Sequence, residues 1–97
     1  MKFYKNKATK YHPSLEVSND EKTWKNMFLT HHPTKTGRYI KLKNNPNPKD
    51  HSDSYIEKHL RNDPIRTRGQ LLKKYRLTEE DLQQIEDFLR RNKKKLV

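Results

Sequence analysis

The chain has 97 residues, enough for one folded domain but not for two. Its formal net charge is +11, and hydrophobic residues make up only 29% of it. The absence of cysteine excludes a disulfide framework and a thiolate zinc site. No apolar run approaches the roughly 18 residues that span a bilayer, so we expect a cytoplasmic protein without a membrane partner.

The excess positive charge is concentrated in the first half of the chain. Residues 1–49 hold 11 Lys and Arg against 3 Asp and Glu, whereas residues 50–97 hold 12 against 9. A positive field of this kind concentrates nucleic acid near a protein surface. We therefore predict nucleic acid or a ribonucleoprotein as the partner, with an acidic protein or no defined partner as the alternative.

The N-terminal half favours strands. Residues 1–10 are rich in lysine, lack a clear period, and are predicted to form a flexible basic arm; a single domain then covers residues 11–97. Residues 14–18 alternate between polar and apolar, and residues 24–30 form a second run, which together predict an antiparallel pair. Residues 38–43 predict a third strand with Ile40 and Leu42 facing the core, so the predicted β half spans residues 11–43.

The C-terminal half favours helices. Two prolines mark residues 44–49 as a linker, and a helical half is predicted over residues 50–92, followed by a basic tail at 93–97. The first helix would end at Asn62 and the second would cover residues 68–75. The third would begin at Thr78 with a stripe of Leu82, Ile85, Phe88 and Leu89. The predicted class is α+β: a small antiparallel sheet or SH3-like partial barrel followed by two or three helices.

The stretch from Thr30 to Lys43 is the first candidate site. It combines two histidines with basic side chains that suit phosphates, and Tyr39 or Trp24 would stack on a base. For Trp24, a position in the core is the favoured interpretation. The candidates here are Lys35, Arg38, Tyr39, Lys41 and Lys43. No metal site is predicted, because adjacent His31 and His32 point to opposite faces of an extended chain and no cysteine assists them.

A second basic run contains Arg61, Arg66, Arg68, Lys73, Lys74 and Arg76. Its Thr67-Arg68-Gly69 turn precedes a predicted helix and would present backbone N–H groups to a phosphate, so Arg66 and Arg68 join the candidate site. The helix after Thr78 is a poor DNA-reading helix, because the acidic side chains of its first turn would repel phosphates.

Three short runs carry a family resemblance: His12-Pro13-Ser14-Leu15-Glu16-Val17, Met27-Phe28-Leu29-Thr30-His31-His32-Pro33-Thr34 and Gly37-Arg38-Tyr39-Ile40-Lys41-Leu42. In order and type they resemble PemK/MazF-type toxins, with a basic-Pro strand start and a strand that ends in Thr. The resemblance covers residues 12–42 and implies an SH3-like barrel that cleaves RNA. The chain also resembles short uncharacterised proteins of Gram-positive bacteria and their phages.

Three functions remain open at this point. The first is non-catalytic nucleic-acid binding, with RNA slightly favoured over DNA and no cofactor. The second is an interaction protein of phage or mobile-element origin that binds a host protein through its helical half. The third is a metal-independent endoribonuclease, in which His31 or His32 acts as the base and Arg38 stabilises the transition-state charge.

Overall fold

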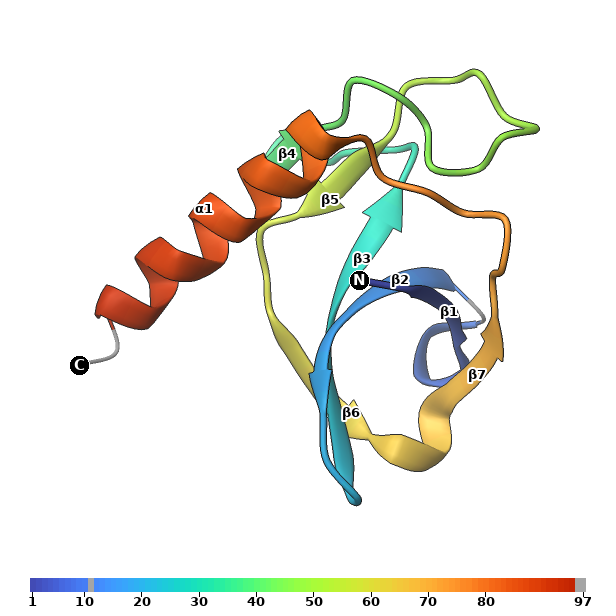
Figure 1. Ribbon diagram of the computed structural model, residues 1–97, viewed down its shortest axis with the longest axis vertical. Coiled ribbons are helices and arrows are strands. Elements are labelled where there is room, and N and C mark those ends of the chain that lie inside the picture. Colours follow the sequence, from blue (N-terminus) through green and yellow to red (C-terminus); the bar gives the residue numbers. More distant parts are fainter. Residues whose placement is uncertain (11, 96–97) are drawn as a thin grey trace.

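The computed structural model describes residues 1–10 and 12–95 and contains seven antiparallel strands and one long helix (Figure 1). The strands are β1 (Phe3–Asn6), β2 (His12–Asn19), β3 (Thr23–Thr30), β4 (Tyr39–Lys41), β5 (Tyr55–Glu57), β6 (Arg61–Pro64) and β7 (Arg68–Leu71). The helix is α1 (Glu79–Lys95), and two 3-10 turns are η1 (Lys7–Thr9) and η2 (Ile65–Thr67). Within the described residues, no helix has the length and apolar character needed to cross a bilayer.

The strands form a sheet that rolls up on itself. Along one path the order is β6, β3, β2, β1 and β7, so β6 and β7 lie at its two ends. Only the three residues of η2 separate these two strands in the chain. A connection this short brings the two ends together, and Figure 1 shows the resulting roll in the lower half of the molecule. The far end of β3 pairs with β5, and β5 pairs with β4.

β1 lies within the segment that its lysine content predicts as a flexible arm. It pairs with β2 on one side and β7 on the other, and Phe3 is only 1% exposed. Asn6 is also fully buried. One inward aromatic in a four-residue strand is too short a pattern to reveal the strand, although it is enough to anchor it.

The predicted pairing of the next two strands is confirmed. β2 and β3 are antiparallel, with Leu15 opposite Met27, and a bulge interrupts the register between Glu16 and Ser18. The predicted third strand shortens to β4, which pairs with β5 and not with β3. Ile40 and Leu42 are buried as expected.

The prediction of two or three helices is wrong, because only α1 is present among the described residues. The region predicted as a first helix holds β5 and β6, and that predicted as a second holds β7 followed by a turn. Ile56 is buried opposite Leu29, whereas its neighbours in β5 are half-buried. Strand pairing with β3 and β1 therefore overrides the local preference of these short segments.

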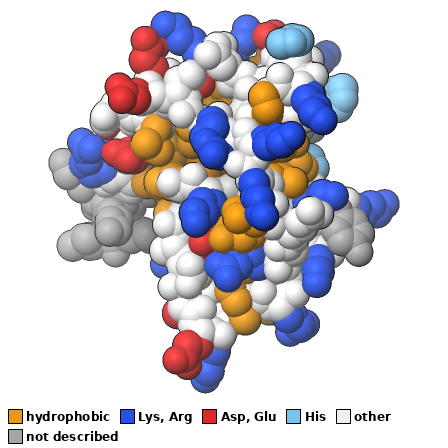
Figure 2. All heavy atoms as spheres, turned by 45° about the vertical axis from the view of Figure 1, so that its right-hand side comes forward, with side chains coloured by type: hydrophobic (Ala, Val, Ile, Leu, Met, Phe, Trp, Pro, Cys, Tyr) orange, Lys and Arg blue, Asp and Glu red, His pale blue; other side chains and the backbone are white. Residues whose placement is uncertain are grey.

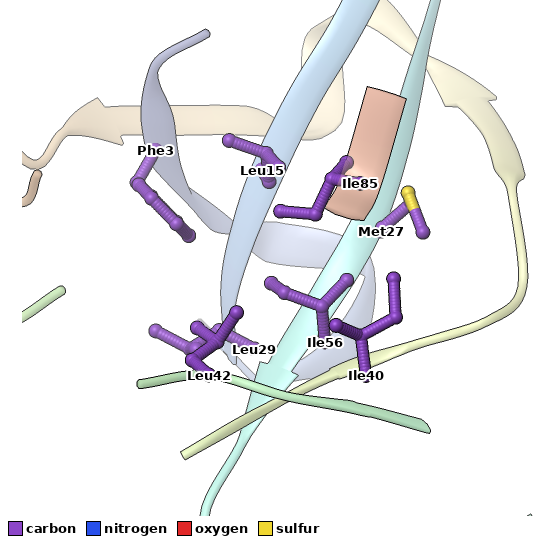
Figure 3. Close-up of a cluster of buried hydrophobic side chains, with 8 residues drawn as sticks. All are labelled: Phe3, Leu15, Met27, Leu29, Ile40, Leu42, Ile56 and Ile85. Atoms are coloured by element: carbon purple, nitrogen blue, oxygen red, sulfur yellow. The ribbon is translucent and has the colours of Figure 1, made fainter. Parts of the chain in front are cut away.

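The main core is formed by side chains from β1 to β5, from Leu42 just after β4, and from α1. It contains Phe3, Leu15, Met27, Leu29, Ile40, Leu42, Ile56 and Ile85 (Figure 3). Of the predicted helical stripe, Ile85 is completely buried, Phe88 and Leu89 are half-buried against this core, and Leu82 is half-buried outside it. The predicted tail continues α1 as far as Lys95, and its residues 96–97 lie outside the described residues.

Asp81 ties the helix to the sheet. It is fully buried, and its carboxylate accepts hydrogen bonds from the backbone N–H groups of Lys43 (2.8 Å) and Asn44 (3.3 Å). Asp81, in the first turn of α1, thus supplies hydrogen-bond acceptors to two backbone N–H groups of the chain that leaves β4. These hydrogen bonds explain why an Asp is tolerated at this buried position.

The opposite side of the rolled sheet encloses polar groups. The Asp63 carboxylate accepts from the amides of Asn6 (3.3 Å) and Asn26 (2.9 Å), and both asparagines are fully buried. Trp24 is buried beside them, and its Nε1 donates to Thr67 Oγ1 over 2.9 Å. The favoured interpretation of Trp24 as a core residue is therefore confirmed, and its ring offers no face to a base.

Candidate nucleic-acid interface

Two hollows open on either side of the chain that leaves β7. They have volumes of about 540 and 570 Å³ and share four lining residues: Leu71, Leu72, Lys73 and Tyr75. Phe3, Leu77 and Leu82 contribute to the first hollow, and Pro48 and Lys49 to the second. We call the two hollows together the Tyr75 groove.

The rim of the Tyr75 groove is basic. Its rim carries five exposed cationic side chains: Lys2, Lys49, Lys73, Lys74 and Arg76. No Asp or Glu lines either hollow, and among the described residues these five form no ion pair with a carboxylate. Figure 2 shows this side of the molecule, where Lys and Arg side chains surround small hydrophobic patches. Unpaired cations over an apolar floor suit a ligand that is both anionic and partly planar.

Backbone hydrogen bonds fix the wall between the two hollows. Leu72 N–H donates to Phe3 O (2.9 Å), and Arg76 N–H donates to Pro46 O (3.0 Å). The Arg76 guanidinium donates to the carbonyls of Lys73 and Tyr75. The segment is thus attached both to β1 and to the 44–49 connector, so its side chains project from a fixed backbone.

Tyr75 stands at the centre of the groove. Its ring centroid lies 5.6 Å from that of Phe3, and the side chain remains half-buried. Burial raises the pKa of the Tyr75 hydroxyl, and the nearby Asp50 carboxylate raises it further, while a hydrogen bond with Asn47 acts in the opposite direction. The hydroxyl therefore stays neutral at physiological pH and adds no negative charge to the groove.

The predicted site between Thr30 and Lys43 is partly neutralised by acidic neighbours. Lys41 Nζ lies 3.6 Å from Asp53 Oδ2, and Lys43 Nζ lies 2.7 Å from Glu80 Oε2. The hydrogen bond with Glu80 raises the pKa of the Lys43 ammonium. These contacts reduce the positive field that β4 presents to solvent.

The other members of that stretch are dispersed. The Tyr39 hydroxyl accepts from Thr34 N–H over 3.1 Å, so the ring holds the loop in place. Lys35 is exposed in the loop, whereas Arg38 lines a separate hollow beside α1, together with Lys58 and Arg91. Tyr39 and Lys41 share the outward face of β4, opposite the buried Ile40, whereas Arg38 lies beside α1.

Arg66 and Arg68 have different environments. Arg66 is exposed in η2. Arg68 NH1 lies 2.6 Å from Glu16 Oε2, and its guanidinium packs over the Tyr4 ring at 4.8 Å. The hydrogen bond with Glu16 raises the pKa of Arg68. Arg68 begins a strand rather than a helix, so the predicted helix terminus for phosphate binding is not formed.

The candidate catalytic histidines lie at the loop that follows β3. His31 Nε2 lies 3.4 Å from Asp50 Oδ2, and the His31 and His32 rings meet edge-on at 6.5 Å. In the described part of the chain, no hydrogen bond or ion pair joins Arg38 to either histidine, and no group of three or more His, Asp or Glu side chains is placed to hold a metal ion.

Sequence analysis singled out only some of the residues that line the Tyr75 groove. Lys73, Lys74 and Arg76 belong to the basic run that it singles out, whereas Lys2, Lys49 and Tyr75 were missed as site residues. Only the folded chain brings residues 2, 49 and 73 together, because β1 pairs with β7 and Pro46 accepts from Arg76. Comparison with models of protein families, with curated proteins and with solved structures gave no match to this chain.

Proposed function

We propose that this protein is a non-catalytic nucleic-acid-binding protein and that the Tyr75 groove is its binding surface. The observation that carries the proposal is the set of five basic side chains that, among the described residues, form no ion pair with a carboxylate and surround an apolar floor. Lysine and arginine contacts to phosphates supply most of the affinity for nucleic acid, because each releases condensed counterions. The partial resemblance to PemK/MazF-type barrels favours RNA over DNA.

No observation favours the two other functions. Among the described residues, the predicted helical half contains β5, β6 and β7 before α1, so the helical surface that was to bind a host protein is reduced to one helix. The histidines proposed for RNA cleavage are separated from Arg38 in the hydrogen-bond network, and His31 is engaged with Asp50. Binding without catalysis is therefore the function that the site supports best.

The test compares three double variants that remove the same amount of charge. Lys73→Gln with Lys74→Gln changes the groove, and Lys41→Gln with Lys43→Gln changes β4. Lys22→Gln with Lys25→Gln changes the β2–β3 hairpin, where both lysines are exposed and lie outside the groove. Binding of a fluorescently labelled single-stranded RNA is followed by anisotropy over a range of salt concentrations.

The groove variant should bind more weakly than the other two. Its plot of log affinity against log salt should flatten by roughly 0.7 for each phosphate contact that is lost. An equal loss in all three variants would show that net charge alone attracts the RNA. A loss confined to the Lys41 and Lys43 variant would place the interface on β4.

A further inference from the structure

We propose that the Tyr75 groove selects unpaired nucleotides and accepts one base in each of its two hollows. This inference rests on the proposed function and specifies the form of nucleic acid that is bound. Each hollow lies within the range of about 300–1,000 Å³ that is usual for sites holding small organic ligands. Each is therefore large enough for a flat heterocycle.

The floor of the groove suits the face of a base. Leu77 and Leu82 are the accessible apolar residues of one hollow, where Phe3 is almost fully buried, and Pro48 lines the other. Tyr75 lines both and is the aromatic surface between them. Bases stack on aromatic and apolar side chains with little sequence preference, since every base has a π face.

The cations are placed where a nucleic-acid backbone would cross the segment that separates the two hollows. Lys73 lines both hollows, whereas Lys2 and Arg76 line only the first, and Lys49 and Lys74 only the second. A phosphate between two inserted bases would lie near Lys73, and the flanking phosphates would meet the cations on either side. The positive side chains thus form a continuous series from the first hollow to the second.

A duplex uses this surface poorly. Its bases are stacked inside the helix, so only phosphates would reach the lysines and the apolar floor would stay empty. In an unpaired strand, the bases can contact the apolar floor while the phosphates contact the cations of the rim. The same reasoning disfavours an acidic peptide without aromatic side chains, which would satisfy the cations alone.

The experiment measures affinity for four probes of similar charge: a single-stranded oligonucleotide, the same backbone with all bases removed, a duplex, and polyglutamate. Removal of the bases should weaken binding by about tenfold or more, the range that one stacked base contributes. The duplex and polyglutamate should also bind more weakly than the intact single strand.

The outcomes separate this inference from the proposed function. Equal affinity for the intact and abasic strands, or for the duplex, would overturn base insertion while leaving nucleic-acid binding in place. Both base insertion and the proposed function would be overturned if polyglutamate bound more tightly than every nucleic-acid probe. They would also be overturned if the single strand, the abasic strand and the duplex all failed to bind.

A variant of the floor gives a second test. Leu71 lines both hollows, is half-exposed and lies outside the main core, so Leu71→Ala should leave the fold intact. It should reduce the preference for the intact over the abasic strand and leave abasic binding unchanged. An unaltered preference would contradict the inference.

Cross-linking of wild-type protein tests the site without any variant. An oligonucleotide that contains 4-thiouridine should attach to the segment 71–77 or to its neighbours across the hollows, as located by mass spectrometry of the peptides. Attachment confined to β4 or to α1 would contradict the inference.

Discussion

The Asn6 side-chain amide donates a hydrogen bond to Asp63 Oδ2 over 3.3 Å, although β2 and β3 lie between their strands in the sheet. A direct contact across two intervening strands requires the sheet to curl, so this face is the inside of the roll. Asn26 and Arg61 also donate to Asp63, which makes this carboxylate the centre of the interior.

Replacement of Asp63 with Asn should destabilise the protein at neutral pH. The variant removes a charged acceptor and turns an N–H group toward Arg61, so we expect a loss of about 1–3 kcal/mol. Urea unfolding followed by circular dichroism measures it. Asp53→Asn is the control, because the Asp53 side chain is 70% exposed and such changes usually stay within about 0.5 kcal/mol.

The contribution of Asp63 should also vanish in acid. Burial raises its pKa, but the hydrogen bonds from Asn26, Arg61 and Asn6 outweigh burial and leave the pKa below 3.8. The unfolded chain then binds more protons, so stability is full above pH 3.8 and is lost as the pH falls through the folded pKa. The difference between wild type and Asp63→Asn should stay constant at mildly acidic pH and shrink only as the pH falls below 3.8. A constant difference would contradict this assignment.

The helix should depend more on Ile85 than on Phe88. Ile85 is fully buried in the main core, and Ile85→Ala should cost about 2–5 kcal/mol. Phe88 is only half-buried, so Phe88→Ala should cost less than the 3–5 kcal/mol typical of a fully buried ring. Thermal unfolding of the two variants should give the lower melting temperature for Ile85→Ala. The reverse order would show that α1 sits differently on the sheet.

Trp24 should report on folding and not on ligand binding. It is the only tryptophan, is fully buried, and lies outside the Tyr75 groove. Its emission should therefore be blue-shifted, resist acrylamide quenching, and stay unchanged when RNA is added. A large change on addition of RNA would place the nucleic acid next to the interior of the roll.

Any side chain at position 69 should lower the stability of the folded protein. A Cβ at this position would lie 2.7 Å from the backbone oxygen of Lys5, so the pairing of β1 with β7 would have to shift. Gly69→Ala should cost about 1–3 kcal/mol, the range for overpacking. Gly37→Ala is the comparison, because its close neighbour is the movable ring of Tyr39 and not a backbone atom. A smaller loss for Gly69→Ala than for Gly37→Ala would contradict this account of the β1–β7 contact.

Strong local periodicity made some elements predictable. The alternation around Leu15 and Ile40 placed two strands, and the stripe that includes Ile85 placed α1. β5, β6 and β7 were missed because each is three or four residues long, too short for its period to emerge. Their conformation is set by partners distant in the chain, as in the pairing of Ile56 with Leu29.

Local reasoning is limited for the candidate site as well. The sequence gives the number of basic residues but not their acidic neighbours. Lys41 and Lys43 looked available, yet the fold places Asp53 and Glu80 beside them. Lys73 carries the same charge, and no carboxylate lines its hollows.

The partnership of β1 with β7 also constrains how the protein is made. Ribosomes release the N-terminus first, so β1 leaves before its partner at Arg68–Leu71 has been synthesised. Until then the outer edge of β1 is an unpaired strand, the kind of edge that recruits other chains. Lys2, Lys5 and Lys7 lie in or beside that strand, and their mutual repulsion opposes aggregation. We therefore expect Lys2, Lys5 and Lys7 to limit aggregation of the nascent chain until β7 has been made and can pair with β1.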